Sequence, residues 1–547
     1  MLLQKRVFQR LIINDKTITN MKKTNLVILL AVFTLFFVSC DNSNKKQYEV
    51  IPDDAAVLVK ANFGNVINES EILEVPMVRT ALDFMVNSMP KESRDMFREI
   101  ITDPSKSGVN VNEPMVVSVS TEPVEVVVSM AMSDKDRFVE VFETLAEGTG
   151  VELVEEDGIT KVDFGNVGKK ELDVAFDSEV MVIVVSENGN ADAGDYMALD
   201  GDRKAINNSK YEDFFAANSD ASLFMDAASL IETFSKLSYY TTEEQSVIYD
   251  LYVEAGLSLL ANLNFENGFA EIDTRMCASD EYMNKMEQYW MTPKGKFLEY
   301  VPFDAVGVCN VALDFGKAFE HESEYMEEML PMIEELGFNE EMIKSLAGEF
   351  MFAVLQPEKL GLQELPQMMF ALECKGRETF DAVLALLGDV ELMSVSDDVY
   401  ALGLNKYYDR SSGEFVAGGY DYYLMYNNDA IFVLPENIYN EVVVDGELKA
   451  FDRNVADNDC FAALEKSGMV GDISAIVAMC EESGLGNMAE FKMALGILGL
   501  FENFEVVMKN PAESSLKVNM VDKDTNVLKQ ILDEAMAIAS SSAFGAF

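Results

Sequence analysis

The sequence predicts an α+β fold of two tandem homologous halves, residues 51–300 and 301–547, each an antiparallel sheet with helices packed on one face. Residues 515–520 alternate between polar and apolar side chains, as a strand with one face in water does. Apolar side chains in 138–145 recur at the i, i+3, i+4, i+7 spacing of an amphipathic helix. Paired strands separated by single helices favour antiparallel sheets covered by helices.

The two halves carry matching segments in the same order, displaced by 239–250 residues. Such a repeat predicts an internal duplication, with its boundary near 300–302. A longer helical stretch, 64–103 or 315–346, follows the first strand of each half, and a helix closes each half. The matching segments are 51–55 with 301–305, 136–145 with 377–387, 151–153 with 390–392, 182–188 with 430–437, 218–221 with 458–461, and the hairpins 262–277 with 505–521.

An apolar run at 26–38 follows two lysines and ends in Ser39-Cys40. A basic start, a short apolar core and a small residue before the processing point predict a signal peptide over 21–39. The core is shorter than the ~20 residues of a permanent membrane helix, although an uncleaved anchor is the alternative. The pattern resembles a bacterial lipobox, with Phe37 where leucine is usual. The resemblance implies that Cys40 receives a diacylglycerol and becomes the mature N-terminus.

Residues 1–20 precede this basic start, so we expect an over-extended gene start and translation from Met21. Residues 40–50 hold the lipidated cysteine and a polar tether, which keeps the folded body close to the bilayer. The tether has a single acidic residue, Asp41, before two lysines. We therefore expect an outer-membrane lipoprotein facing the periplasm, with surface exposure as the alternative.

The chain is strongly acidic. Its 95 acidic and 42 basic residues give a formal charge of −53, and removing residues 1–39 takes away one acidic and six basic residues, which leaves −58. Such a charge repels phosphate backbones, so no nucleic-acid partner is expected. The apolar fraction of 49% supplies ample core.

The cysteines and the single histidine do not suggest a catalytic or metal site. Besides Cys40 there are five cysteines and no C-x-x-C pair, which favours buried free thiols while leaving one or two disulfides open. His321 stands between glutamates in a predicted exposed helix, where a solvated role is expected. The sequence therefore predicts no catalytic residue, no cofactor and no metal ligand. The five cysteines are Cys277, Cys309, Cys374, Cys460 and Cys480.

Three short motifs imitate functional ones. Residues 514–517 match S-x-x-K, but they lie on a predicted strand, where the serine and lysine point to opposite faces. Residues 484–489 match G-x-G-x-x-A, but they join two helices instead of following a strand. Residues 188–194 resemble a calcium loop with a misplaced glycine and no closing glutamate, so a polar hairpin loop is expected.

The lipobox, the polar tether, the I/V-P-x-D-A openings at 51–55 and 301–305 and the two halves resemble a family of Bacteroides-type envelope lipoproteins. That family is catalogued only as a domain of unknown function, and the resemblance implies no site residues. We expect a non-enzymatic binding or scaffold protein, tethered to the membrane through Cys40, whose partner is an envelope protein or an apolar ligand. The 32 methionines favour a carrier of lipid or another apolar ligand as the alternative. A carboxylate-based hydrolase is the third hypothesis, because paired acids work without histidine.

Overall fold

The computed structural model describes residues 45–89, 91–111, 113–147, 151–164, 171–187, 191–237, 252–321, 330, 339–356, 367–387, 391–403, 406–409, 414–417, 421–444, 468–482 and 489–544. Cys40, Cys460 and the predicted match at 458–461 lie outside these residues. Within the described segments, no helix combines the length and the apolar character needed to cross a membrane. The described residues form helices and antiparallel strands, which confirms the α+β prediction.

The chain divides into two compact units. The first contains residues up to Asp54 together with Lys60–Ser209. The second contains Ala55–Val59 together with the residues from Lys210 onward. The boundary that the sequence predicts between its two halves, at 300/301, lies inside the second unit. The compact units and the predicted halves are therefore different divisions of the chain.

The sheet of the first unit has the strand order β2-β3-β7-β6-β5-β4, with every neighbouring pair antiparallel. Its centre is rich in valine, which suits a pleated surface buried on both faces. The strands are β2 (Met115–Thr121), β3 (Val124–Ala131), β4 (Glu152–Glu156), β5 (Ile159–Asp163), β6 (Leu172–Phe176) and β7 (Val180–Ser186).

The helix α7 covers one face of this sheet, where Phe138 packs edge-on against Phe176 at a ring distance of 4.9 Å. On the opposite face, Val182 and its neighbours pack against Val50 and Ala193. The helices of the unit are α3 (Lys46–Glu49), α4 (Phe63–Ser70), η1 (Ile72–Glu74), α5 (Pro76–Ser88), α6 (Lys91–Thr102), η2 (Pro104–Ser107), α7 (Lys135–Ala146), α8 (Ala193–Met197), η3 (Gly201–Arg203) and η4 (Ala205–Asn207).

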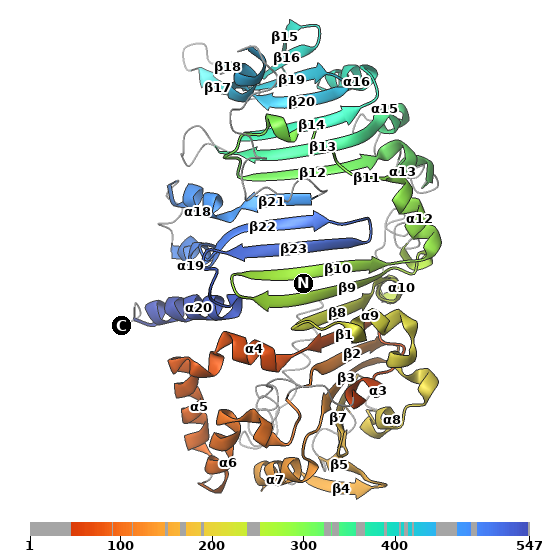
Figure 1. Cartoon of the computed structure of the whole chain (residues 1–547), viewed down its shortest axis with the longest axis vertical. Coiled ribbons are helices and arrows are strands. Elements are labelled where there is room, and N and C mark those ends of the chain that lie inside the picture. The colour runs from red at the N-terminus through yellow and green to blue at the C-terminus, as the bar shows by residue number, and fades with distance from the viewer. Residues whose placement is uncertain are drawn as a thin grey trace. The chain divides into compact units, whose positions relative to one another are not determined.

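The sheet of the second unit has the order β1-β8-β9-β10-β23-β22-β21-β12-β13-β14-β20-β19-β16-β15, and β11 pairs with one end of β12 (Figure 1). The predicted hairpins 262–277 and 505–521 are confirmed as β9–β10 and β22–β23. A separate hairpin joins β17 to β18. The strands are β1 (Val57–Ala61), β8 (Ala221–Asp226), β9 (Ser258–Glu266), β10 (Phe269–Cys277), β11 (Trp290–Met291), β12 (Gly307–Asp314), β13 (Leu346–Leu355), β14 (Gln367–Cys374), β15 (Glu391–Ser396), β16 (Val399–Gly403), β17 (Lys406–Asp409), β18 (Glu414–Ala417), β19 (Tyr422–Asn427), β20 (Ala430–Pro435), β21 (Gly468–Asp472), β22 (Phe501–Met508) and β23 (Glu513–Met520).

The main core of the second unit packs Phe297 and Val301 against Met351 and Phe432, while Phe380 of α16 covers another face. The helices are η5 (Ser209–Tyr211), α9 (Glu212–Ala216), α10 (Ala227–Leu237), α12 (Asp280–Tyr289), η6 (Leu298–Tyr300), α13 (Phe315–His321), α15 (Glu340–Ser345), α16 (Glu378–Leu386), α17 (Glu436–Tyr439), η7 (Asn440–Val444, a π-helical turn), α18 (Ile473–Glu482), α19 (Ala489–Leu498) and α20 (Val527–Phe544).

Two groups of strands share one order. The strands β2-β3-β7-β6-β5-β4 of the first unit correspond to β13-β14-β20-β19-β16-β15 of the second, and β8-β9-β10 corresponds to β21-β22-β23. Helices occupy the same places, because α7 and α16 each follow the second strand of their group, and α10 and α18 each follow β8 or β21. This correspondence supports the duplication, which stays a proposal.

Four strand-to-helix junctions use the same capping chemistry. Asn62 follows β1, and its side-chain oxygen accepts from the backbone N–H of Asn65 at 3.2 Å. At the end of β12, Asp314 accepts from Lys317 N at 3.1 Å. A short oxygen-bearing side chain at this position satisfies a backbone donor that the first helical turn leaves free. In the other two caps, Asp226 accepts from the backbone N–H of Ser229 at 3.1 Å and Asp472 accepts from that of Ala475 at 2.8 Å.

Candidate functional site

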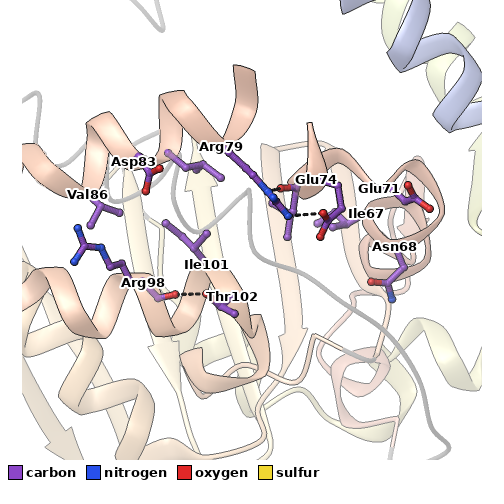
Figure 2. A pocket seen from close by; sticks show the side chains of 12 residues that line it. Ile67, Asn68, Glu71, Glu74, Arg79, Asp83, Val86, Arg98, Ile101 and Thr102 are labelled. Atoms are coloured by element: carbon purple, nitrogen blue, oxygen red, sulfur yellow. Dashed lines mark hydrogen bonds and ion pairs between the residues drawn. The ribbon is translucent and has the colours of Figure 1, made fainter. Parts of the chain in front are cut away.

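A cavity of about 620 Å³ lies among α4, η1, α5 and α6 of the first unit (Figure 2). The sequence predicts helix over 64–103, and the structure divides that stretch into these four elements. Pro76 begins α5, a position where its missing N–H costs nothing. The lining residues are Ile67, Asn68, Glu71, Leu73, Glu74, Arg79, Leu82, Asp83, Val86, Arg98, Ile101 and Thr102.

The apolar wall of this cavity consists of side chains from all four elements. Leu82 and Val86 lie one turn apart on α5, and Ile101 faces them from α6. Val86 is also part of the small core that holds α5 and α6 together with α7. The wall is therefore built on packed helices, which fixes its shape.

Charged side chains surround the apolar wall. The guanidinium of Arg79 donates to the carbonyl oxygen of Leu73 at 2.9 Å and forms an ion pair with Glu74 (Figure 2). Arg98 donates to the side-chain oxygen of Asn87 at 3.1 Å. The side-chain carboxylate of Asp83 makes no hydrogen bond or ion pair with any residue that the structure describes (Figure 2).

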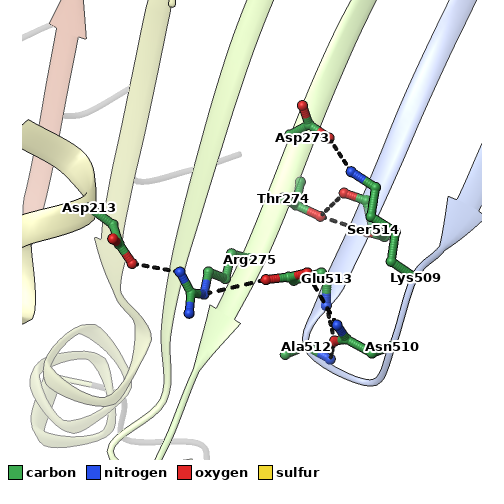
Figure 3. Close-up of polar contacts among 9 residues, drawn as sticks. All are labelled: Asp213, Asp273, Thr274, Arg275, Lys509, Asn510, Ala512, Glu513 and Ser514. Carbon is green, nitrogen blue, oxygen red and sulfur yellow. Dashed lines mark hydrogen bonds and ion pairs between the residues drawn. The ribbon is translucent and has the colours of Figure 1, made fainter. Parts of the chain in front are cut away.

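A second, smaller cavity of about 390 Å³ lies in the second unit, beside the pairing of β10 with β23, which we call the seam. Figure 3 shows polar side chains from α9, β10, β23 and the β22–β23 turn meeting there. The lining residues are Asp213, Ala216, Ala217, Leu260, Asn262, Asp273, Thr274, Arg275, Lys509 and Glu513.

Ion pairs cross the seam. Arg275 donates to Asp213 at 2.7 Å and lies 3.7 Å from Glu513 (Figure 3). The ammonium of Lys509 donates to Asp273 at 2.9 Å, and this hydrogen bond raises the pKa of Lys509. Each of these three carboxylates thus has a cation within 4 Å.

These ion pairs join side chains of α9, β10, β23 and the β22–β23 turn to one another (Figure 3). Beside these ion pairs, the buried side-chain oxygen Oδ1 of Asn262 accepts no hydrogen bond from any residue that the structure describes.

The described part of the chain places four of the predicted thiols. Within the described residues, Cys277, Cys309 and Cys374 form no disulfide, and Cys374 is buried as predicted. Cys277 is exposed at the end of β10, and Cys309 and Cys480 are only half-buried, so these three differ from the expectation of buried thiols. Burial raises the pKa of Cys374 to about 11.

The motif interpretations are settled where the structure describes the residues. Ser514 and Lys517 lie on β23, so the S-x-x-K match is no catalytic motif. Asp192, from the calcium-like loop, caps α8 and pairs with Lys161 at 3.1 Å. His321 ends α13, and its side chain lies outside the described set, as do residues 484–488. Among described residues, no group of three or more His, Cys, Asp or Glu side chains is placed to hold a metal ion.

Sequence reasoning missed both cavities. The apolar spacing in 64–103 predicts helices, but the space among α4, α5 and α6 depends on how these helices pack, which spacing does not give. The seam residues lie about 240 positions apart in the chain. The predicted duplication offers one signal for the seam, because two equivalent hairpins would each present an open edge that can pair with the other.

Residues 48–492 match the family described as Domain of unknown function (DUF4836). The chain belongs to this family. This confirms the expected resemblance to a family known only as a domain of unknown function. No curated protein matches this DUF4836 chain. Among solved structures, crystal forms I, III and IV of TP0453 are similar at 10% to 11% identity, covering 42% of this chain and 77% to 79% of that chain. Their TM-scores of 0.24 to 0.25 carry no inference about fold or function.

Proposed function

We propose that this DUF4836 chain is a membrane-tethered, non-enzymatic binding protein, and that the cavity among α4, α5 and α6 is its ligand site. The observation that carries the proposal is the cavity itself, whose volume of about 620 Å³ falls in the range of small-molecule sites. Its apolar wall with a few charged groups at the rim is typical of sites that hold an apolar ligand and orient its polar end.

The proposed tether is the lipid on Cys40. Lys45, the first described residue, follows Cys40 by five positions, which an extended chain spans in roughly 18 Å. The short tether supports a ligand site held near the outer membrane, on its periplasmic side. Several acyl chains on one cysteine anchor a protein stably, because each buried methylene contributes about 0.8 kcal/mol.

Lipidation is tested in the producing cell by labelling with a fatty acid that carries a clickable group. The unchanged chain should incorporate the label and sediment with membranes, whereas Cys40→Ala should lose both properties. Label retained by Cys40→Ala would contradict the assignment of this residue. Cys277→Ala is the matched control and should keep the label.

Ligand binding is tested on protein lacking residues 1–40, which the structure does not describe. A fluorescent alkyl probe should bind, and Leu82→Gln should weaken its binding because the polar amide would lie in the apolar wall. Equal binding by the variant would show that the probe lies elsewhere. A polar change outside the cavity, Thr144→Gln on α7, is the control.

A further inference from the structure

We propose that the helical cavity selects an amphiphile whose polar end is positively charged, such as an alkylammonium. This inference rests on the proposed function, because it names the ligand class of the same site. The supporting observation is that both arginines at the rim have hydrogen-bond acceptors, whereas one carboxylate, that of Asp83, has no partner among the described residues.

Three acidic and two basic side chains line the cavity: Glu71, Glu74 and Asp83 against Arg79 and Arg98. Both guanidinium groups are already engaged. Arg79 is held by Glu74 and by the carbonyl of Leu73. Arg98 is held by Asn87 at 3.1 Å and lies 3.9 Å from Asp95 on its own helix.

Asp83 is the acidic group that has no partner among the described residues. It lies on α5 one position from Leu82 and three from Val86, both of which belong to the apolar wall. A ligand with its chain against this wall can therefore reach the carboxylate with its polar end.

The charge of the whole chain acts in the same direction. A formal charge of −53 attracts cationic ligands and repels anionic ones on approach. A fatty carboxylate would need a guanidinium group to bind its charge, and the guanidinium groups of Arg79 and Arg98 already donate to other acceptors. The cavity therefore favours an ammonium group over a carboxylate on the same alkyl chain.

The test compares dodecyltrimethylammonium, dodecanoate and dodecyl maltoside by calorimetry, below their micelle-forming concentrations. The ammonium probe should bind more tightly than dodecanoate. Asp83→Asn should weaken its binding about three- to fivefold, the upper range for an exposed charge pair. Glu143→Gln removes an exposed charge from α7 outside the cavity and should leave binding unchanged. Added salt should reduce the preference.

The outcomes separate the inference from the proposed function. If dodecanoate or the maltoside binds as tightly as the ammonium probe, and Leu82→Gln weakens all three, the cavity is a ligand site but the charge selection is wrong. Unchanged binding of the ammonium probe by Asp83→Asn also overturns the selection. If no probe responds to Leu82→Gln, both proposals fail. Circular dichroism of each variant establishes that the helices are intact.

Discussion

The side-chain hydroxyls of Thr274 and Ser514 lie 2.6 Å apart, so that one donates a hydrogen bond to the other across the seam. The two residues are 240 positions apart and belong to β10 and β23, the second strands of the hairpins predicted at 262–277 and 505–521. The pairing joins the β9–β10 hairpin to the β22–β23 hairpin, so that neither hairpin leaves an open sheet edge there.

The Thr274–Ser514 contact should be measurable as a coupling energy. Thr274→Val and Ser514→Ala should each lower the free energy of unfolding by about 1 kcal/mol, because each removes one partner of a half-buried hydrogen bond. The double variant should cost less than the sum, which urea denaturation of all four proteins will show. Strict additivity would contradict the contact.

The carboxylate of Asp226 should make the stability of the second unit depend on pH. Burial raises the pKa of this group, but hydrogen bonds from Lys210 and Ser229 outweigh burial and hold the pKa below its ordinary 3.8. A group with a lowered folded-state pKa stabilises the fold above its unfolded-state value and loses this contribution as pH falls through the folded-state value. Asp226→Asn should therefore cost about 1–3 kcal/mol at pH 7 and progressively less below pH 4.

Asp472 is the matched control for this prediction, because it caps α18 as Asp226 caps α10. Asp472→Asn preserves a capping oxygen, so it should lower the free energy of unfolding by only a few tenths of a kcal/mol at pH 7. An equal pH dependence in both variants would show that Lys210 contributes nothing to the effect.

Two glycines of the first unit form a natural pair for testing close packing. Gly108 and Gly158 have nearly the same left-handed backbone, with φ of +87° and +85°. A Cβ on Gly108 would lie 2.5 Å from the carbonyl oxygen of Asp134, whereas nothing lies within 4 Å of one on Gly158. Gly158→Ala should lower the free energy of unfolding by about 1–2 kcal/mol, because alanine is strained in this left-handed backbone conformation.

Gly108→Ala should cost more than Gly158→Ala, by at least about 1–3 kcal/mol, because the backbone at the start of α7 must shift as well. Thermal unfolding of the two variants side by side measures the difference. Equal melting temperatures would mean that the approach of Gly108 to α7 is looser than the structure has it.

Thiol labelling should follow exposure. Cys277 is exposed, whereas Cys374 is buried and its pKa is raised to about 11, so little thiolate forms there at pH 8. N-ethylmaleimide should therefore modify Cys277 at least roughly tenfold faster than Cys374 in the folded protein. Both should react alike in guanidinium chloride, and fast native labelling of Cys374 would contradict its burial.

Much of the fold was predictable from the spacing of apolar residues and from the turn residues between strands. The alternation in 515–520 predicted the strand β23, but Ser515 is buried there and Leu516 and Val518 are half-buried, so the expected polar face in water is not found. The apolar spacing in 138–145 predicted α7, because Phe138 and Phe142 lie on one side of the helix. The hairpin ends were predictable from Asn267-Gly268 and Asn510-Pro511.

The division into compact units was not predictable in the same way. Matching segments in the sequence predict which elements recur in the same order. They do not predict which strands pair, and this pairing decides the compact units. The pairing of β10 with β23 places strands from both predicted halves in one unit. The charged rim of the cavity was equally hidden, because nothing local marks Asp83 as the acidic group left without a described partner. Cavities and charge pairing arise from helix packing, which single-sequence patterns do not specify.

A crystal structure of the protein with a bromine-labelled alkylammonium is the most direct test of the central claim. The anomalous signal of a bromine at the end of the alkyl chain should lie against Leu82, Val86 and Ile101, with the ammonium near Asp83. A signal at the seam or on the outer surface of the protein, with the cavity empty, would contradict the account.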